Sequence, residues 1–226
     1  MAKPKLIIFA SGTKDGGGSG FEKLVTASRS TVLDADIVAV ISNHEHGGVR
    51  QRAERLGIPF RYFKLEGGSL AQAAGYQRIV RETGAEWVIL SGWLKLVLGL
   101  DPRRTCNIHP ALLSALAGRF GGKGMYGHRV HEAVKTAHDD GEIGESGFSM
   151  HFVTNEYDRG PVFAEIHAPL HRGMTADEIG RVVNALEHAW QPWLTNLVVH
   201  GEISWDGKNP ESLRIPKNLY KTITVI

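Results

Sequence analysis

The sequence has few of the features that mark secreted, membrane-spanning or metal-binding proteins. Cys106 is the only cysteine in 226 residues, which excludes an internal disulfide and a CxxC metal site. No apolar run approaches the ~18 residues of a membrane-spanning helix, and no signal peptide precedes the first strand-like run. The 26 basic and 24 acidic residues leave a formal charge of +2, so nothing indicates a nucleic-acid or membrane surface. We expect a cytoplasmic protein.

Alternating apolar and amphipathic segments fill the first half of the chain. Strands are predicted at Leu6–Ala10, Ile37–Ile41, Phe60–Phe63, Trp87–Leu90 and Thr105–Ile108. Helices are predicted between them at Phe21–Ser30, Gly48–Leu56 and Ser69–Thr83. This order predicts an α/β fold with a doubly wound, mostly parallel central sheet and helices on both faces, as in Rossmann-like proteins. With no internal repeat and no clear linker, residues 1–226 are expected to form one domain.

The second half has a different pattern. A glycine-rich irregular stretch covers Ala111–Tyr126 and is followed by a predicted helix at Val130–Ala137. Two strands, Ser149–Val153 and Val162–His167, are predicted to pair through a turn at residues 158–161, giving an antiparallel element. A long helix is predicted at Ala176–Val199, with Thr175 as its N-cap. Pro192 should kink or break it, and the tail Pro210–Ile226 is polar enough to lie over the surface.

A cluster of glycines at Ser11–Gly20 follows the first strand and opens the first helix. Backbone N–H groups at such a helix start suit a phosphate, although a flexible connection has the same composition. The cluster is not a Walker A loop, because no Gly-Lys-Ser/Thr closes it. It also fails the GxGxxG pattern, since Phe21 stands at the third glycine position, and the second strand ends in Ser42-Asn43 without an acid. Binding of NAD is therefore disfavoured.

Two histidine pairs have a spacing that could suit a metal. They are His44 with His46, and His128 with His131. Neither pair has a third ligand at a recognised spacing, and 11 histidines make such pairs common by chance. We interpret all four as surface residues and predict no metal.

The strongest catalytic candidates are Asn107 and His109, at the end of a predicted strand where open α/β sheets bind ligands. Their side chains share a face of an extended chain, and an amide N–H with an imidazolium could stabilise an oxyanion. A buried Asn capping a turn beside an ordinary core His is the alternative. Asp158 lies in a turn context, where it could cap the turn or pair with Arg159. If it approaches His109, its charge favours imidazolium and raises the pKa of that ring.

The sequence resembles the phosphoribosylglycinamide formyltransferases, which formylate glycinamide ribonucleotide with 10-formyltetrahydrofolate in purine synthesis. The matching motifs run from Leu6 to about Trp193 and include Ile41–Asn43, Ser91–Val97, Asn107–Leu113, Gly147–Val153 with Asp158–Pro161, and Glu187–His188. The Asn-Ile-His-Pro motif with a later Asp-x-Gly-Pro is specific to enzymes that use 10-formyltetrahydrofolate. It does not separate these enzymes from one another.

The resemblance implies a role for each matching residue. Asn107, His109 and Asp158 would form the catalytic set, and Gly18, Ser19 and Gly20 would hold the substrate phosphate. Glu187 would contact the glycinamide end of the ribonucleotide. The folate would lie between Leu94, Lys95, Leu96 and Val97 on one side and Thr154, Asn155, Glu156 and Tyr157 on the other. The single domain would thus have an N-terminal half at about 1–100 that binds the phosphate. A second half at about 101–205 would bind the folate and carry out catalysis, and a C-terminal tail would follow at 206–226.

Two departures from the family pattern stand out. Five residues separate Gly12 from Gly18, and Gly20 replaces the usual asparagine, which affects the phosphate contacts. The stretch after Asn-Ile-His-Pro lacks its usual prolines and becomes glycine-rich over Gly118–Gly127, which could form a hinged lid. In that lid Arg119 and Lys123 could reach an anion, or could be solvated surface.

The implied reaction is direct formyl transfer to the substrate amine, without a metal. Asn107 and imidazolium His109 would stabilise the tetrahedral oxyanion, Asp158 would keep His109 charged, and water would relay the proton to N10. One rival is a formyltetrahydrofolate deformylase, which usually carries an extra N-terminal domain. Sugar-nucleotide and methionyl-tRNA formyltransferases usually carry a larger C-terminal extension. A binding module without catalysis is the non-enzyme alternative. A homodimer is an open expectation.

Overall fold

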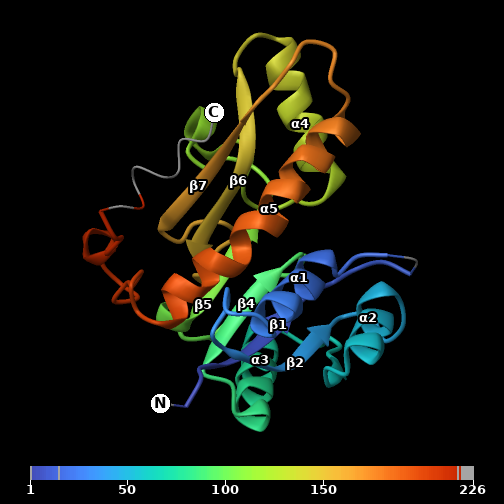
Figure 1. The fold of residues 1–226 in the computed structure, drawn as a ribbon, viewed down its shortest axis with the longest axis vertical. Coiled ribbons are helices and arrows are strands. Elements are labelled where there is room, and N and C mark those ends of the chain that lie inside the picture. The colour runs from blue at the N-terminus through green and yellow to red at the C-terminus, as the bar shows by residue number, and fades with distance from the viewer. Residues whose placement is uncertain (1, 15, 218, 220–226) are drawn as a thin grey trace.

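The computed structural model describes residues 2–14, 16–217 and 219, and is built on a seven-stranded sheet in the order β3-β2-β1-β4-β5-β6-β7 (Figure 1). The strands are β1 (Lys5–Phe9), β2 (Asp36–Ser42), β3 (Phe60–Tyr62), β4 (Trp87–Ser91), β5 (Thr105–His109), β6 (Glu145–Phe152) and β7 (Val162–Pro169). The helices are α1 (Ser19–Ser28), α2 (Gly48–Leu56), α3 (Ser69–Thr83), α4 (His128–Asp139) and α5 (Ala176–Val199). Short 3-10 turns lie at η1 (Pro102–Arg104), η2 (Ala115–Gly118) and η3 (Pro210–Ser212).

The sheet is parallel from β3 to β5, and β6 and β7 are antiparallel to their neighbours. The predicted doubly wound α/β fold with an antiparallel element is confirmed. Strand β6 begins at Glu145, four positions before the predicted Ser149. Its start was missed because Ser146 and Gly147 lack the apolar side chains that indicate a strand. Pairing of Gly147 with His167 of β7 keeps this segment extended.

The core lies on both faces of the sheet because strand side chains alternate between them. In β1, Leu6 and Ile8 are fully buried in the cluster that includes α1, α4 and α5. Their neighbours Ile7 and Phe9 are fully buried in the opposite cluster, where the ring of Tyr76 on α3 packs against Phe9 at a centroid distance of 5.6 Å. Helices α1, α2, α4 and α5 thus pack on one face of the sheet, and α3 packs on the other.

Helix α5 spans the molecule beside α1 and α4 (Figure 1). The Thr175 side chain accepts a bond from the Glu178 N–H, and the Glu178 carboxylate accepts one from the Thr175 N–H, which completes a capping box. Of the predicted kink or break at Pro192, the break is wrong, because α5 continues to Val199. Pro192 is buried, and its packing offsets the one intrahelical bond that its ring removes.

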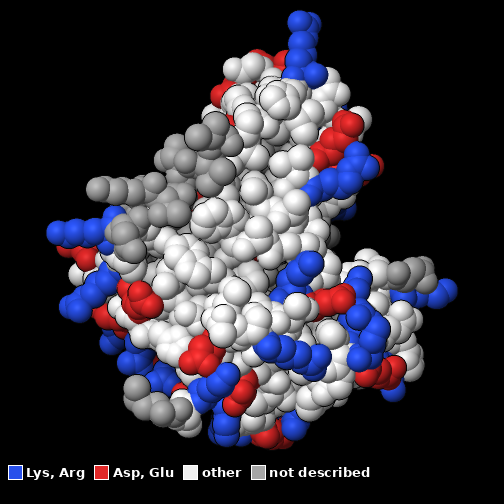
Figure 2. Space-filling model, in the orientation of Figure 1, with Lys and Arg blue, Asp and Glu red and all other residues white. Residues whose placement is uncertain are grey.

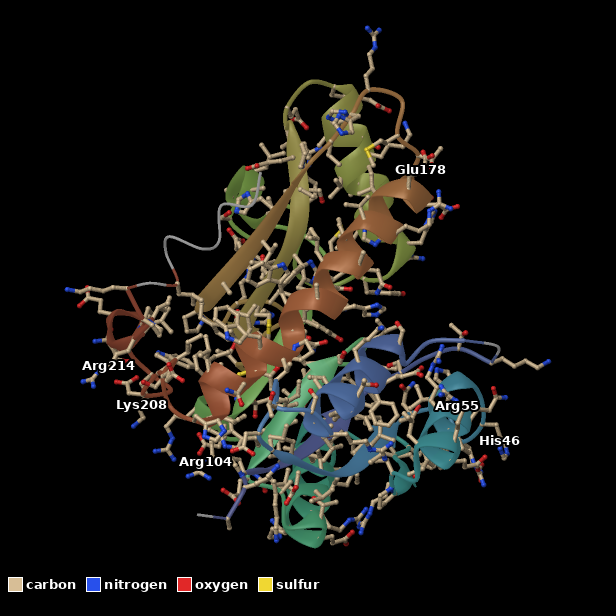
Figure 3. The ribbon with its side chains drawn as sticks, in the orientation of Figure 1. His46, Arg55, Arg104, Glu178, Lys208 and Arg214 are labelled. Atoms are coloured by element: carbon tan, nitrogen blue, oxygen red, sulfur yellow. The ribbon has the colours of Figure 1, made fainter. Side chains whose placement is uncertain are left out.

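After α5 the chain folds back beside η1 through an anchored segment at residues 201–217. Ile203 is fully buried, and the ring of Trp205 packs against Phe152 at a centroid distance of 5.8 Å. Lys208 and Arg214 of this segment point outward on the same side as Arg104 (Figure 3). Leu213 and Ile215 of the predicted polar tail also pack against the core cluster, while residues 218 and 220–226 lie outside the described residues.

Charged side chains of both signs are interspersed on the face shown in Figure 2, with a largely uncharged centre. This mixture matches the small formal charge of +2. In the part of the chain that the structure describes, no helix has the length and apolar character needed to cross a bilayer.

Candidate active site

The candidate site is a cavity of about 700 Å³ at the carboxyl ends of β4 and β5, closed by residues of α1, α4, α5 and the loop at 111–127. The fold places it where parallel strands end and helices begin, the usual ligand position in open α/β sheets. Ten of the predicted site residues line it: Gly18, Ser19, Gly20, Leu94, Lys95, Asn107, His109, Tyr157, Asp158 and Glu187. The predicted phosphate and catalytic residues therefore share one cavity.

His109 ends β5 and is almost fully buried, with 3% of its surface exposed. Its Nε2 lies 2.7 Å from the carbonyl oxygen of Phe120, so Nε2–H donates and the neutral ring leaves Nδ1 unprotonated. Nδ1 lies 3.7 Å from Oδ2 of Asp158. Burial lowers the pKa of His109, although the charge of Asp158 and the bond to Phe120 act in the opposite direction. The contact with Asp158 thus acts on this pKa in the predicted direction, and burial has the larger, opposite effect.

Asn107 meets a second histidine, His151, which lies directly opposite it in the β5–β6 pairing. The Nδ1–H of His151 donates to the carbonyl oxygen of Phe152 at 2.8 Å, which leaves Nε2 as an acceptor. The Asn107 Nδ2 group donates to this Nε2 at 3.0 Å and, at a longer 3.4 Å, to Oδ1 of Asp158. His151 therefore fixes the amide with its N–H groups toward Asp158.

Asp158 projects from the β6–β7 turn in a left-handed conformation with φ 53. An Asp tolerates this region better than most residues. Its Oδ2 accepts a bond from the Gly122 N–H at 2.9 Å, so the carboxylate also holds the loop at 111–127. Burial alone would raise the pKa of Asp158, but His151, His109 and the Gly122 N–H together lower it. The structure thus brings Asn107, His109 and an ionised Asp158 together, as predicted.

The glycine cluster forms a tight loop that ends at the start of α1. Gly18 is the N-cap with φ 80, a left-handed conformation that glycine adopts without strain. The Arg52 side chain donates to the carbonyl of Gly17 at 2.9 Å, and Nε2 of His188 lies 3.1 Å from the Ser19 hydroxyl. N–H groups of a first helical turn have no intrahelical partner, and Gly18, Ser19 and Gly20 of this turn line the cavity. The arrangement suits an anion.

Glu187 lies in the same cavity, on the face of α5 toward β4 and α1. Burial raises its pKa to about 7, and the Asn184 amide that donates to its Oε2 at 3.2 Å lowers the pKa only in part. A carboxyl group in such a setting can change its charge near neutral pH. It is suited to bind hydroxyl or amine groups of a ligand.

The predicted folate residues divide between two spaces. Val97, Thr154 and Asn155 line a second cavity of about 160 Å³, which Gly207 of the C-terminal segment helps to close. Leu96 and Glu156 are absent from the linings of both cavities. The Leu96 carbonyl accepts a bond from the Tyr76 hydroxyl at 3.0 Å, and the Glu156 N–H donates to Thr154 Oγ1 at 3.3 Å. These two residues shape the surrounding backbone.

Sequence reasoning missed several residues of the site. His151 was not identified, because only the cross-strand register places it beside Asn107. Gln191 and His131 line the main cavity, and each carries a buried side-chain nitrogen without a hydrogen-bond partner among the described residues. A spacing of four positions on one helix face links Gln191 to Glu187 and could have indicated it.

The predicted surface position of His46 is confirmed, since its ring points outward beside α2 (Figure 3). His131 is a correction, because it lies in the cavity with its pKa lowered by burial to about 4. Within residues 2–14, 16–217 and 219, no group of three or more His, Cys, Asp or Glu side chains is arranged to hold a metal ion.

Comparisons with known proteins agree with this geometry. Residues 4–195 match the formyl transferase family. The chain is 32% identical over 210 residues to a chloroplastic phosphoribosylglycinamide formyltransferase of Arabidopsis thaliana, covering 90% of this chain and 68% of that protein. The crystal structure of glycinamide ribonucleotide transformylase 1 from Symbiobacterium toebii is similar with a TM-score of 0.77 and 25% identity, covering 94% of each chain.

A formyltetrahydrofolate deformylase from Pseudomonas syringae has the same fold. The TM-score is 0.72 at 20% identity, over 91% of this chain and 65% of that one. The fold alone therefore does not separate transfer to an amine from transfer to water.

Proposed function

Because the chain belongs to the formyl transferase family and, within it, to the phosphoribosylglycinamide formyltransferases, we propose that it transfers a formyl group from 10-formyltetrahydrofolate to the amine of glycinamide ribonucleotide in purine synthesis. The observation that supports this most is the single cavity shared by Asn107, His109 and Asp158 and the glycine loop at the start of α1. A reacting carbonyl and an anionic substrate can occupy this cavity together.

In this proposal the substrate amine attacks the formyl carbon and a new C–N bond forms. Charge then develops on the formyl oxygen. The Asn107 N–H that now reaches Asp158 at 3.4 Å is the donor we expect to turn to that oxygen, because this bond is long and weak. One such donor contributes ~3–4 kcal/mol to lowering a barrier of this kind.

The attacking nitrogen must lose a proton, and N10 of the folate must gain one as its bond to the formyl carbon breaks. We assign the transfer to Nδ1 of His109, because Nε2–H is held by the Phe120 carbonyl and burial lowers the pKa of the ring, which favours the form with a free Nδ1. Ionised Asp158, 3.7 Å away, stabilises the imidazolium that forms. A water molecule carries the proton on to N10. The proposal therefore replaces the predicted imidazolium donor with a neutral acceptor.

Binding is divided between the two halves of the domain. Gly18, Ser19 and Gly20 would hold the phosphate in a half at about 1–100, and Glu187 would contact the ribonucleotide from α5. The folate would lie between Leu94–Val97, at the end of the first half, and residues 154–157 of the half at about 101–205. The smaller cavity of about 160 Å³ beside Val97 and Asn155 adjoins this region and has both apolar and polar lining residues.

The test is an assay of the purified protein with the formyl donor alone and with glycinamide ribonucleotide. Formation of formylated ribonucleotide that is lost in His109→Asn and retained in His46→Asn, in the exposed loop before α2, supports the proposal. Rapid formate release without the amine would favour a deformylase, and formylation of other amines would favour another N-formyltransferase. Binding without turnover would favour a nucleotide- or folate-binding module.

The cellular location and the oligomeric state of the protein are separate parts of the proposal, and each has its own test. We propose a cytoplasmic location, which subcellular fractionation tests. We also propose a homodimer, which light scattering during size-exclusion chromatography tests. A single species at the monomer mass would overturn the homodimer.

A further inference from the structure

The floor of the cavity contains a glutamine that no step of the proposed reaction uses. Gln191 lies on α5, one turn beyond Glu187, and only 1% of its surface is exposed. Its Oε1 accepts a bond at 3.1 Å from the hydroxyl of Ser91, the last residue of β4. A buried polar side chain is costly unless it is fully bonded, so both halves of this amide need an explanation.

The nitrogen half has no partner. Nε2 of Gln191 is buried and makes no hydrogen bond with any described residue, although its side chain lines the cavity. An amide nitrogen left in this state costs ~1–3 kcal/mol relative to a bonded one. Because Ser91 fixes the oxygen, the two N–H groups are held in one orientation.

The neighbouring backbone leaves room for this pair. A Cβ at Gly20 would lie 2.3 Å from the Ser91 hydroxyl oxygen and 3.3 Å from Oε1 of Gln191. Any side chain at position 20 would displace the Ser91–Gln191 bond. The absence of a side chain therefore brings the start of α1 against the amide. The glycine loop and Gln191 border the same cavity.

We propose that Gln191 is a recognition residue for the phosphate of the ribonucleotide, donating an Nε2–H to a phosphate oxygen held at the start of α1. This assignment rests on the proposed function for the identity of the substrate, but its chemistry is that of any small phosphate ester. Backbone N–H groups of the first turn contact the anion from one side, and the α5 amide contacts it from the other.

The charge of the surroundings favours this use of a neutral donor. His188, on the same helix, lies beside Ser19, and burial lowers its pKa, so this ring adds little positive charge. Arg52 and Arg55 both bind the carboxylate of Glu22. An uncharged amide that is already desolvated then supplies specificity at small cost on binding.

The variant that tests this is Gln191→Met, which preserves volume and removes the donor. A hydrogen bond to a charged group predicts that KM for glycinamide ribonucleotide rises ~10-fold or more, with kcat and KM for the formyl donor within about twofold. Gln191→Glu should raise KM further, because it places a carboxylate beside the phosphate.

Thr195→Val is the matched control. Thr195 lies one turn further on α5, does not line the cavity, and carries a buried hydroxyl oxygen that has no hydrogen-bond partner among the described residues. Its kinetics should equal those of the wild type.

Direct binding separates this proposal from the proposed function. Titration calorimetry with inorganic phosphate and with ribose 5-phosphate measures the site even if no formyl transfer occurs. Weaker binding to both Gln191 variants, with binding by Thr195→Val unchanged, supports the assignment. Unchanged phosphate binding and KM in folded Gln191→Met would overturn it, as would an equal loss in Thr195→Val. If Gln191→Met does not fold, the same titrations are made with Gln191→Glu, which keeps a polar side chain. Unchanged phosphate binding by that variant would overturn the assignment.

Discussion

Glu187→Gln is a direct test of how the cavity treats charge. In the wild type, burial raises the pKa of Glu187 from the ordinary 4.5 to about 7. A tenfold change in an acid constant corresponds to about 1.36 kcal/mol, so ionising this buried group costs at most about 3 kcal/mol. Because the side chain is partly exposed, solvent screening reduces this to roughly 1–2 kcal/mol. The neutral glutamine has nearly the same shape and avoids this cost.

The sign of the effect follows from the direction of the shift. A group whose pKa is raised by folding contributes stability that is complete below its unfolded pKa of 4.5 and lost as pH rises through about 7. We expect Glu187→Gln to gain roughly 1–2 kcal/mol over the wild type between pH 5 and pH 8. Urea unfolding at both pH values measures this gain, with Glu86→Gln on the exposed surface as the control. A stability difference that is the same at pH 5 and pH 8 would refute the reasoning.

Three further substitutions test other parts of the structure. Asp158→Asn removes the charge beside both histidines and should lower kcat ~100-fold or more; near-normal turnover across pH 6–8 would remove Asp158 from the mechanism. His151→Leu deprives the Asn107 amide of its 3.0 Å acceptor and should lower kcat ~10-fold while KM for both substrates changes little; an effect on KM alone would contradict a positioning role. Gly160→Ala places a methyl group 1.7 Å from the Phe152 carbonyl oxygen and should cost ~3 kcal/mol in urea unfolding. Gly144→Ala, whose methyl group would meet no described residue other than its chain neighbours within 4 Å, should cost little.

The strands and helices that surround the site could be predicted from the sequence, because their apolar patterns are local. Asn107 and His109 could be placed at the carboxyl end of β5 from their position after a short apolar run. Asp158 could be joined to them through the family motif. His151 could not be placed beside Asn107 from the sequence. The two residues are 44 positions apart, and their contact depends on the register between β5 and β6. No local pattern contains that register.

The loop at 111–127 shows a second limit of sequence reasoning. Its glycines suggested a lid, but not that the Phe120 carbonyl would bind His109 or that the Gly122 N–H would bind Asp158. Phe120 itself is almost fully buried, with 1% of its surface exposed, and this apolar anchor fixes the backbone on either side of it. Two bonds from one loop therefore orient both titratable catalytic groups. A glycine count carries no information about such contacts.

The charge states of the site follow from the competition between burial and pairing. From sequence, a carboxylate near an imidazole predicts a raised pKa for the ring, and the contact with Asp158 does act in that direction. Burial outweighs this contact for His109, because the ring is enclosed while the carboxylate stays 3.7 Å away. Asp158 remains ionised since three neighbours compensate its own burial. A neutral base beside a fixed negative charge can accept a proton during the reaction and release it afterwards, which an imidazolium at the start of the reaction could not do.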